Sequence, residues 1–274
     1  MTLPPVANSE AIKSCCATVY GSEWARLLIG DSMHPGGVEL TQRLGDLLQL
    51  GPDGRVLDVA AGRGVSALAL AQRFGCQVVG IDLSPANVQF ARDQANRSGL
   101  ADLVSFQVAD AETLPFEDCE FTAVICECAF CTFPDKTRAA SEFARVLNPC
   151  GRLGLSDLVR RADLPSELRT LAGWVACIAD ARSDTEYIAY LELAGFADSR
   201  VEVHDQVLAD MARRIRLRLL SATMLKRFGQ LELGDVDLAA ASRLAREAEL
   251  AISGGLLGYV VLTARRSSHL RRRR

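Results

Sequence analysis

The sequence predicts an α/β fold: a Rossmann-like, doubly wound, seven-stranded and mostly parallel sheet with an N-terminal helical lid and helical insertions. From residue 55 onward, short apolar runs alternate with segments of helical apolar spacing, which is the pattern of consecutive βαβ units. A glycine-containing loop follows the first of these runs, at the point where such sheets bind their ligands. Apolar residues make up 49% and charged residues 24% of the 274 residues, so a folded globular chain is expected.

Charge and cysteine content narrow the class of protein. The net charge of −3 gives no reason to expect a nucleic-acid partner, and the basic tail Arg271–Arg274 is expected to be a solvated end. No apolar run is long enough to cross a bilayer, and the first residues lack the pattern of a signal peptide, so we expect a cytoplasmic protein without a membrane partner. Nine cysteines, an odd number, are then expected to be reduced thiols.

The elements are expected in the following order. Residues 8–50 predict helices, interrupted at His34–Gly37 by a Pro-Gly-Gly turn. Next come five apolar strands at 56–60, 77–81, 104–108, 121–126 and 151–155, and helices at 66–74, 84–98 and 136–147.

The last part of the chain departs from this alternation. The pattern predicts a helical insertion over 165–181, a helix over 185–194 that ends at Gly195, and a sixth strand over 200–204. An amphipathic helix over 206–227, a second helix over 235–252 and a last strand over 256–262 complete the chain. The apolar face of the helix over 206–227 consists of Val207, Met211, Ile215 and Leu219.

Three carboxylates lie in or directly after successive predicted strands. They help to decide between a site for a dinucleotide and a site for a cationic nucleoside. Gly62–Ala67 fits the dinucleotide fingerprint, which alone is weak evidence. Asp58 stands inside an apolar strand, and a buried carboxylate there needs a cation or donors as partner. Together with Asp82 and Asp110 it suits a cationic nucleoside better than a pyrophosphate. N-capping and turn formation are the alternative roles for these residues.

These residues resemble the class I S-adenosylmethionine-dependent methyltransferases. The resemblance rests on Val56–Gly64, Gly80–Ser84, Asp110–Phe116 and Arg145–Arg152. It implies that Asp58 and the glycine loop hold the methionine end of S-adenosylmethionine, that Asp82 takes the ribose, and that Asp110 with Ala111 takes the adenine. The full set of expected cofactor residues is Asp58, Ala60, Gly62, Gly64, Asp82, Leu83, Asp110, Ala111, Glu112 and Glu127.

Two residues depart from the family's glycines. Ala60 stands for the first loop glycine, and an alanine is suitable only if this residue does not need a positive φ. Cys150 stands for the second glycine of the turn before the fifth strand.

A cluster of thiols follows the fourth strand. Cys126 and Cys128 share a face if the strand continues that far, and Cys131 lies just beyond. Core packing, as expected for Cys76 and Cys119, is one interpretation. A structural zinc site is another, although the paired CxxC spacing is missing. A thiolate site for the substrate is the third.

A further resemblance, to the arsenite methyltransferases, favours the third interpretation. Cys128 precedes Pro134-Asp135-Lys136 by that family's offset, and Cys177 precedes a helix that ends in Gly195-Phe196. The resemblance implies that Cys128 and Cys177 are arsenic ligands. Cys15 and Cys16 differ in order and spacing from that family's pattern. We take Cys16 as the third ligand, with Cys15, Cys126 and Cys131 as open alternatives. Arsenic is here a substrate and not a resident metal.

We therefore expect methyl transfer from S-adenosylmethionine to a thiolate-bound trivalent arsenic, presented as arsenite or a thiol complex, by in-line displacement. A lone pair on arsenic makes a general base unnecessary. The alternatives are methylation of a small organic metabolite, with structural cysteines, and a sensor without catalysis. We expect one domain over 1–274, divided into a lid (1–50), a cofactor-binding half (51–157) and a substrate-side half (158–274). The oligomeric state of the protein is left open, and a dimer is one of the alternatives.

Overall fold

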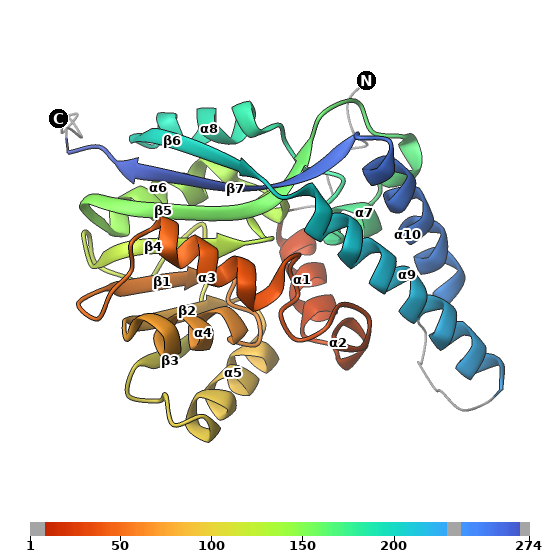
Figure 1. The fold of residues 1–274 in the computed structure, drawn as a ribbon, viewed down its shortest axis with the longest axis horizontal. Coiled ribbons are helices and arrows are strands. Elements are labelled where there is room, and N and C mark those ends of the chain that lie inside the picture. The colour runs from red at the N-terminus through yellow and green to blue at the C-terminus, as the bar shows by residue number, and fades with distance from the viewer. Residues whose placement is uncertain (1–8, 229–236, 269–274) are drawn as a thin grey trace.

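The computed structural model describes residues 9–228 and 237–268. Seven strands form one sheet in the order β3-β2-β1-β4-β5-β7-β6 (Figure 1). The strands are β1 Arg55–Val59, β2 Gln77–Asp82, β3 Val104–Val108, β4 Phe121–Glu127, β5 Leu147–Arg160, β6 Phe196–Val203 and β7 Leu257–Arg266. The pairs among β1 to β5 are parallel, whereas β7 is antiparallel to both β5 and β6. The predicted α/β fold with a mostly parallel seven-stranded sheet is confirmed.

Helices cover the sheet on both sides, with α3 in front of it and α6 behind it in Figure 1. The helices are α1 Ser9–Tyr20, α2 Glu23–Ile29, α3 Gly37–Leu47, α4 Val65–Phe74, α5 Pro85–Arg97, α6 Lys136–Val146, α7 Leu171–Val175, α8 Asp184–Leu193, α9 Asp205–Arg227 and α10 Leu238–Ser253. Two short 3-10 helices, η1 Phe130–Thr132 and η2 Ser166–Leu168, complete the elements. Ser84 caps α5 ahead of Pro85, as the sequence predicted.

Two predicted elements differ from the structure. The fifth strand is much longer than 151–155 because it pairs along its length with β7. The helical insertion expected over 165–181 contains only η2 and α7. Helix α7 ends early in a Schellman arrangement, in which Cys177 N–H donates to Trp174 O and Ile178 N–H donates to Gly173 O.

The N-terminal helices lie over the carboxyl ends of the strands. Tyr20, the last residue of α1, donates its hydroxyl hydrogen to Val175 O at 2.6 Å. Glu23 of α2 accepts from Arg63 Nη2 at 2.8 Å, so both helices are fixed to the body of the molecule by polar contacts. None of the helices in residues 9–228 and 237–268 is long and apolar enough to cross a membrane. The predicted division into a lid and two halves stays a prediction. The predictions for the tail Arg271–Arg274 and for the start of the helix expected from 235 lie outside the described residues.

Candidate active site

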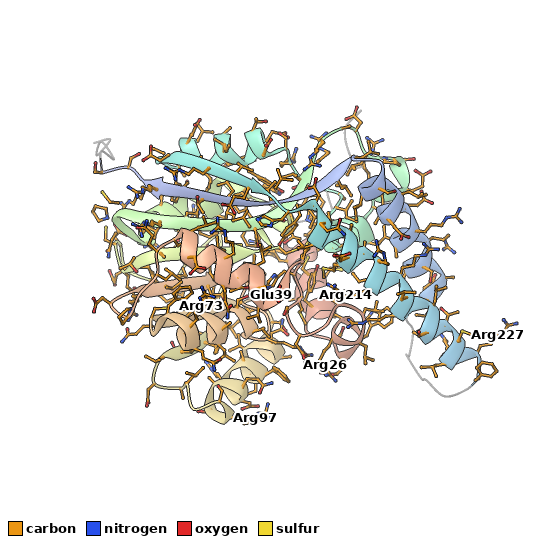
Figure 2. The ribbon with its side chains drawn as sticks, in the orientation of Figure 1. Arg26, Glu39, Arg73, Arg97, Arg214 and Arg227 are labelled. Carbon is orange, nitrogen blue, oxygen red and sulfur yellow. The ribbon has the colours of Figure 1, made fainter. Side chains whose placement is uncertain are left out.

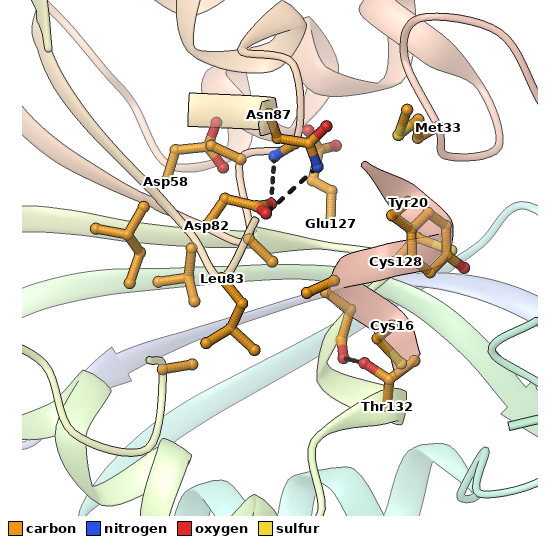
Figure 3. A pocket seen from close by; sticks show the side chains of 18 of the residues that line it. Cys16, Tyr20, Met33, Asp58, Asp82, Leu83, Asn87, Glu127, Cys128 and Thr132 are labelled. Carbon is orange, nitrogen blue, oxygen red and sulfur yellow. Dashed lines mark hydrogen bonds between the residues drawn. The ribbon is translucent and has the colours of Figure 1, made fainter. Parts of the chain in front are cut away.

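A pocket opens at the carboxyl ends of β1, β2 and β4, beneath α1 (Figure 3). Of the expected cofactor residues, all but Gly64 and Glu112 line it. Those that do are Asp58, Ala60, Gly62, Asp82, Leu83, Asp110, Ala111 and Glu127. Parallel strands place their carboxyl ends at one edge of the sheet, so residues up to 69 positions apart in the sequence meet here.

Asp82 ends β2 and is surrounded by donors. Its carboxylate accepts from Gly62 N–H at 2.9 Å, Ser84 N–H at 2.8 Å and the Asn87 side-chain amide at 3.3 Å (Figure 3). Burial raises the pKa of Asp82, although these three donors oppose the rise. Asp82 therefore couples the glycine loop to the start of α5 while facing the pocket, which combines the turn role with the predicted ribose role.

Asp58 is the carboxylate whose environment most clearly calls for a ligand. It is 2% exposed, and its Oδ2 has no hydrogen-bond partner among the residues that the structure describes. Burial raises the pKa of Asp58 well above its usual range, and the neighbouring Glu127 and Asp82 raise it further. A cationic ammonium group in the pocket would supply both the missing donor and the missing charge, so the residues fit the methionine end of S-adenosylmethionine.

The loop between β1 and α4 takes left-handed backbone conformations at three residues. Ala60 has φ +59°, Gly62 +53° and Gly64 +82°. Ala60 thus has the positive φ that we expected this position not to need, and it adopts a strained conformation. Gly64 does not line the pocket; a Cβ there would lie 2.6 Å from the ring of Phe106, so Gly64 allows close packing of the loop on β3.

A lysine that the sequence did not indicate closes the expected adenine end. Lys13 of α1 lies 2.7 Å from Asp110 Oδ2 and 2.5 Å from Glu112 Oε2. Glu112 also accepts from Asp135 N–H at 2.9 Å and does not line the pocket. These contacts anchor α1 and the loop before α6, and the role of Glu112 toward the cofactor stays a prediction.

Glu127 ends β4 at the centre of a buried polar network that includes His34. Its carboxylate accepts from Thr41 Oγ1 at 2.8 Å and from Ser66 Oγ at 2.6 Å. His34 Nε2 lies 3.7 Å away, and both His34 and Glu127 are buried and line the pocket. Helical spacing gave no signal for His34, Thr41 or Ser66, which only the fold brings to Glu127.

Two distant cysteines meet beside this pocket. The Cys177 Sγ lies 3.2 Å from the carbonyl oxygen of Cys128, and the Tyr20 hydroxyl lies 3.5 Å from the same Sγ. Hydrogen bonds from the thiols of Cys128 and Cys131 lower the pKa of Cys177, while the bond to Cys177 raises the pKa of Cys128. A Cys177 thiol that donates to the carbonyl oxygen of Cys128 is protonated, whereas a Cys177 that accepts from the thiols of Cys128 and Cys131 is a thiolate. The three buried thiols therefore share their protons.

The remaining cysteines occupy different surroundings. Cys16 on α1 lines the pocket with Cys128 (Figure 3), and burial raises its pKa to about 12, with a further contribution from Cys177. Cys177 and Cys131 are buried outside the pocket lining. Within residues 9–228 and 237–268, no three His, Cys, Asp or Glu side chains form a metal-binding group. Cys15, Cys76, Cys119, Cys126 and Cys150 do not line the pocket.

Two expectations about the cysteines are corrected. Strand β4 ends at Glu127 and Cys128 has φ +53°, so the alternation that would align Cys126 with Cys128 does not continue. Cys126 is fully buried, and burial raises its pKa. Cys119, expected in the core, is exposed, whereas Cys76 is buried as predicted.

A buried ion pair fixes the segments that carry these thiols. Lys136 and Asp180 pair with both side chains almost fully buried. Lys136 also donates to the carbonyl oxygens of Cys131 at 2.9 Å and Phe133 at 3.1 Å. The loop after β4 and the segment after Cys177 are thereby joined.

Known proteins share both the sequence and the fold of this chain. A model of the family described as methyltransferase domain matches residues 57–155. Together with the fold and the carboxylate-lined pocket, this match identifies residues 57–155 as a class I S-adenosylmethionine-dependent methyltransferase domain, the cofactor of which is S-adenosylmethionine. Three relatives show how widely the sequence is shared.

Methyltransferase GfsG of Streptomyces halstedii is 34% identical over 60% of this chain and 60% of its own length. The arsenite methyltransferase of Halobacterium salinarum is 30% identical over 57% of this chain and 41% of its own. The sarcosine/dimethylglycine N-methyltransferase of Halorhodospira halochloris is 28% identical over 92% of this chain and 90% of its own length. The match thus spans only three-fifths of the length of GfsG.

Two solved structures share the fold over nearly the whole chain. A putative sarcosine dimethylglycine methyltransferase from Galdieria sulphuraria has a TM-score of 0.78 at 18% identity, covering 93% of this chain and 99% of that one. The [4+2]-cyclase SpnF has a TM-score of 0.77 at 22% identity, covering 98% and 100%. At these identities the likeness concerns the fold alone.

Proposed function

We propose that the chain transfers a methyl group from S-adenosylmethionine to trivalent arsenic, as arsenite or a related metalloid, held by Cys128 and Cys177 with Cys16 as third thiol. The observation that carries the proposal is the meeting of Cys177 with Cys128, 49 residues apart, beside the cofactor pocket. Cys16 supports it, because it lines the same pocket as Cys128 and is carried by α1.

Thiolates are soft donors and bind soft or borderline elements. S-adenosylmethionine supplies an electrophilic methyl carbon on its sulfonium sulfur. The arsenic lone pair forms the As–C bond while the S–C bond breaks and its electrons stay on sulfur, so arsenic is oxidised from trivalent to pentavalent. Because no proton is removed from arsenic, the chain needs no general base, and its task is to hold the reactants aligned and dry.

The chain's own residues suit these tasks. Asp58 offers an unused oxygen to an ammonium group, and Asp82 is held by its donors in a fixed orientation. Lys136 and Asp180 hold the two thiol-bearing segments together. Arsenite that arrives as a complex with a small thiol would exchange ligands, each protein thiol passing its proton to the thiol it displaces.

A second candidate is methylation of a small organic acceptor, with the cysteines as packing. The buried His34 beside Glu127 favours it, because both residues line the pocket and an oxygen or nitrogen acceptor needs a base. The relative that matches as 27-O-demethylrifamycin SV methyltransferase, from Amycolatopsis mediterranei, is 32% identical over 62% of this chain. A sensor without turnover is the third possibility.

One assay separates arsenic methylation from the other two candidates. The purified chain is incubated with S-adenosylmethionine, arsenite and a thiol reductant, and methylated arsenic and S-adenosylhomocysteine are quantified. We expect both products from the wild type, and neither from Cys128→Ser or Cys177→Ser, whose cofactor affinity by calorimetry stays near the wild-type value.

Cys150→Ser is the matched control, because Cys150 also has a positive φ but is exposed. It should retain full turnover. Full activity of both Cys128→Ser and Cys177→Ser would reject the thiolate site. Cofactor binding without arsenic methylation by the wild type would favour the organic acceptor or the sensor.

A further inference from the structure

The outward side of α9 carries an apolar stripe that the methyl-transfer site does not use. Helix α9 buries Leu208, Met211 and Leu219 against the body of the protein. Five large apolar side chains of α9 and of the residue after it are exposed, Leu225 at 42% and four that lie on one side: Leu217 57%, Leu220 51%, Met224 61% and Phe228 71%. The spacing of these four by three and four residues puts them on one side of the helix, and we call them the α9 stripe.

Basic residues flank the α9 stripe on both sides. Residues 211–228 contain six basic side chains and no acidic one. They are Arg213, Arg214, Arg216, Arg218, Lys226 and Arg227, all exposed. Among the described residues only two of them form ion pairs, Arg213 with Asp210 and Arg216 with Glu249. The chain as a whole has a net charge of −3, so this segment concentrates positive charge against the average.

The position of the segment makes it accessible. Figure 1 shows α9 and α10 projecting from the sheet as a pair, with the end of α9 far from the core. In Figure 2, Arg227 projects at the far tip of α9, and Arg214 lies on the same helix closer to the sheet. Arg218 reaches back to the carbonyl oxygen of Leu28 at 2.9 Å, which braces α9 on α2.

We propose that the α9 stripe docks the protein on the surface of an anionic lipid bilayer. A helix with leucine, methionine and phenylalanine on one side and arginines along its edges lies in the membrane interface, where the apolar side chains enter the acyl boundary. Arginine stems extend along apolar surface while their guanidinium groups reach the lipid phosphates. The sequence predicted no membrane partner, because it contains no apolar run long enough to cross a bilayer. A helix that lies on the membrane surface needs no such run, and the fold exposes the α9 stripe for this contact.

A second copy of the chain is the competing occupant, and its charge disfavours it. Two α9 stripes packed together would bring only positive flanking residues against each other, since 211–228 has no acidic residue. An anionic surface meets the same residues with opposite charge. This inference is independent of the methyl acceptor.

The test is flotation of the full chain with vesicles of phosphatidylcholine alone or of phosphatidylcholine with phosphatidylglycerol. We expect binding only to the anionic vesicles, weakening as salt rises. The double variant L220Q/F228Q should bind at least about ten-fold more weakly. The double variant R214Q/R227Q should lose roughly five-fold per arginine.

Leu193→Gln on α8 and Arg97→Gln on α5 are matched controls, because Leu193 is 79% exposed and Arg97 is an exposed arginine of another helix. Both should float like the wild type. Cofactor binding by every variant shows that it is folded. Absence of flotation, or equal flotation with neutral vesicles, would overturn the proposal. So would a concentration-dependent dimer in sedimentation that L220Q/F228Q dissociates without any vesicle binding.

Discussion

Cys177 and Cys128 both hold left-handed backbone conformations, with φ +64° and +53°, and meet where the Cys177 Sγ lies 3.2 Å from the Cys128 carbonyl oxygen. Left-handed conformations cost an L-residue about 1–2 kcal/mol, and glycine is the usual occupant of such positions. Cys177 occupies the position after α7 where a Schellman motif favours glycine. Strain of this kind persists where the surroundings impose it and is concentrated at functional sites.

Cofactor binding should release a proton through Asp58. Its pKa is raised in the protein without ligand, so the carboxyl holds its proton there at a pH where a free aspartate would be ionised. An ammonium group favours the ionised form and lowers that pKa, so affinity should fall as pH decreases. Calorimetry in two buffers of different ionisation enthalpy measures the proton directly.

The control for this prediction is Asp58→Asn, which keeps the shape but cannot ionise. It should weaken S-adenosylmethionine binding by about 1.5–3 kcal/mol and lose most of the pH dependence. If Asp58→Asn releases as many protons as the wild type, the titrating group lies elsewhere, and Asp82, whose pKa is also raised, is the next candidate.

Ala60→Gly should stabilise the protein. Ala60 has φ +59°, and glycine removes the steric cost while adding chain entropy to the unfolded state. The expected net gain is about 0.5–1 kcal/mol in the free energy of unfolding, measured by denaturant titration. Ala61→Gly, at a neighbour without a positive φ, should lose a similar amount. Equal effects of the two substitutions would mean that Ala60 is not strained.

Lys13→Met should loosen α1. Lys13 holds the helix to Asp110 and Glu112 across 97 and 99 residues of sequence, with side chains between 13% and 34% exposed. The contact contributes on the order of 1 kcal/mol and weakens with salt. Amides of residues 9–20 should therefore exchange faster in Lys13→Met, while Lys13→Arg stays close to the wild type. Wild-type exchange should quicken with added salt, and a salt effect that persists unchanged in Lys13→Met would argue against this contact.

Removing one partner of the Lys136–Asp180 pair should reduce the stability of the protein far more than replacing both partners with apolar residues. Lys136→Met leaves Asp180 buried with Arg182 as its remaining ion-pair partner, and about 3 kcal/mol of stability should be lost. The double variant Lys136→Met/Asp180→Leu also removes the buried carboxylate that has lost Lys136 and should recover most of that loss. Denaturant titration of the two variants provides the comparison. A double variant no more stable than the single one would show that the pair contributes more than charge compensation.

Most of the fold could be predicted because each element carries its own local signal. Ser84-Pro85 marks the start of α5, and the alternation of apolar runs marks the parallel strands. The segment over 165–181 could not be predicted, because its helical spacing is interrupted by the left-handed turn at Cys177, which depends on tertiary contacts. Likewise, Lys13 of α1 and His34 of the loop between α2 and α3 reach the site without any motif of their own.

The sequence by itself determined the α/β class, the cofactor and the carboxylates that line the pocket, because alternating strands and helices and the glycine loop between them are local patterns of a right-handed βαβ chain. Only the tertiary structure decided that Cys177 meets Cys128, that Glu112 anchors α1, and which side of α9 is exposed. The physical reason is that these relationships join residues distant in sequence, and packing of whole elements sets them.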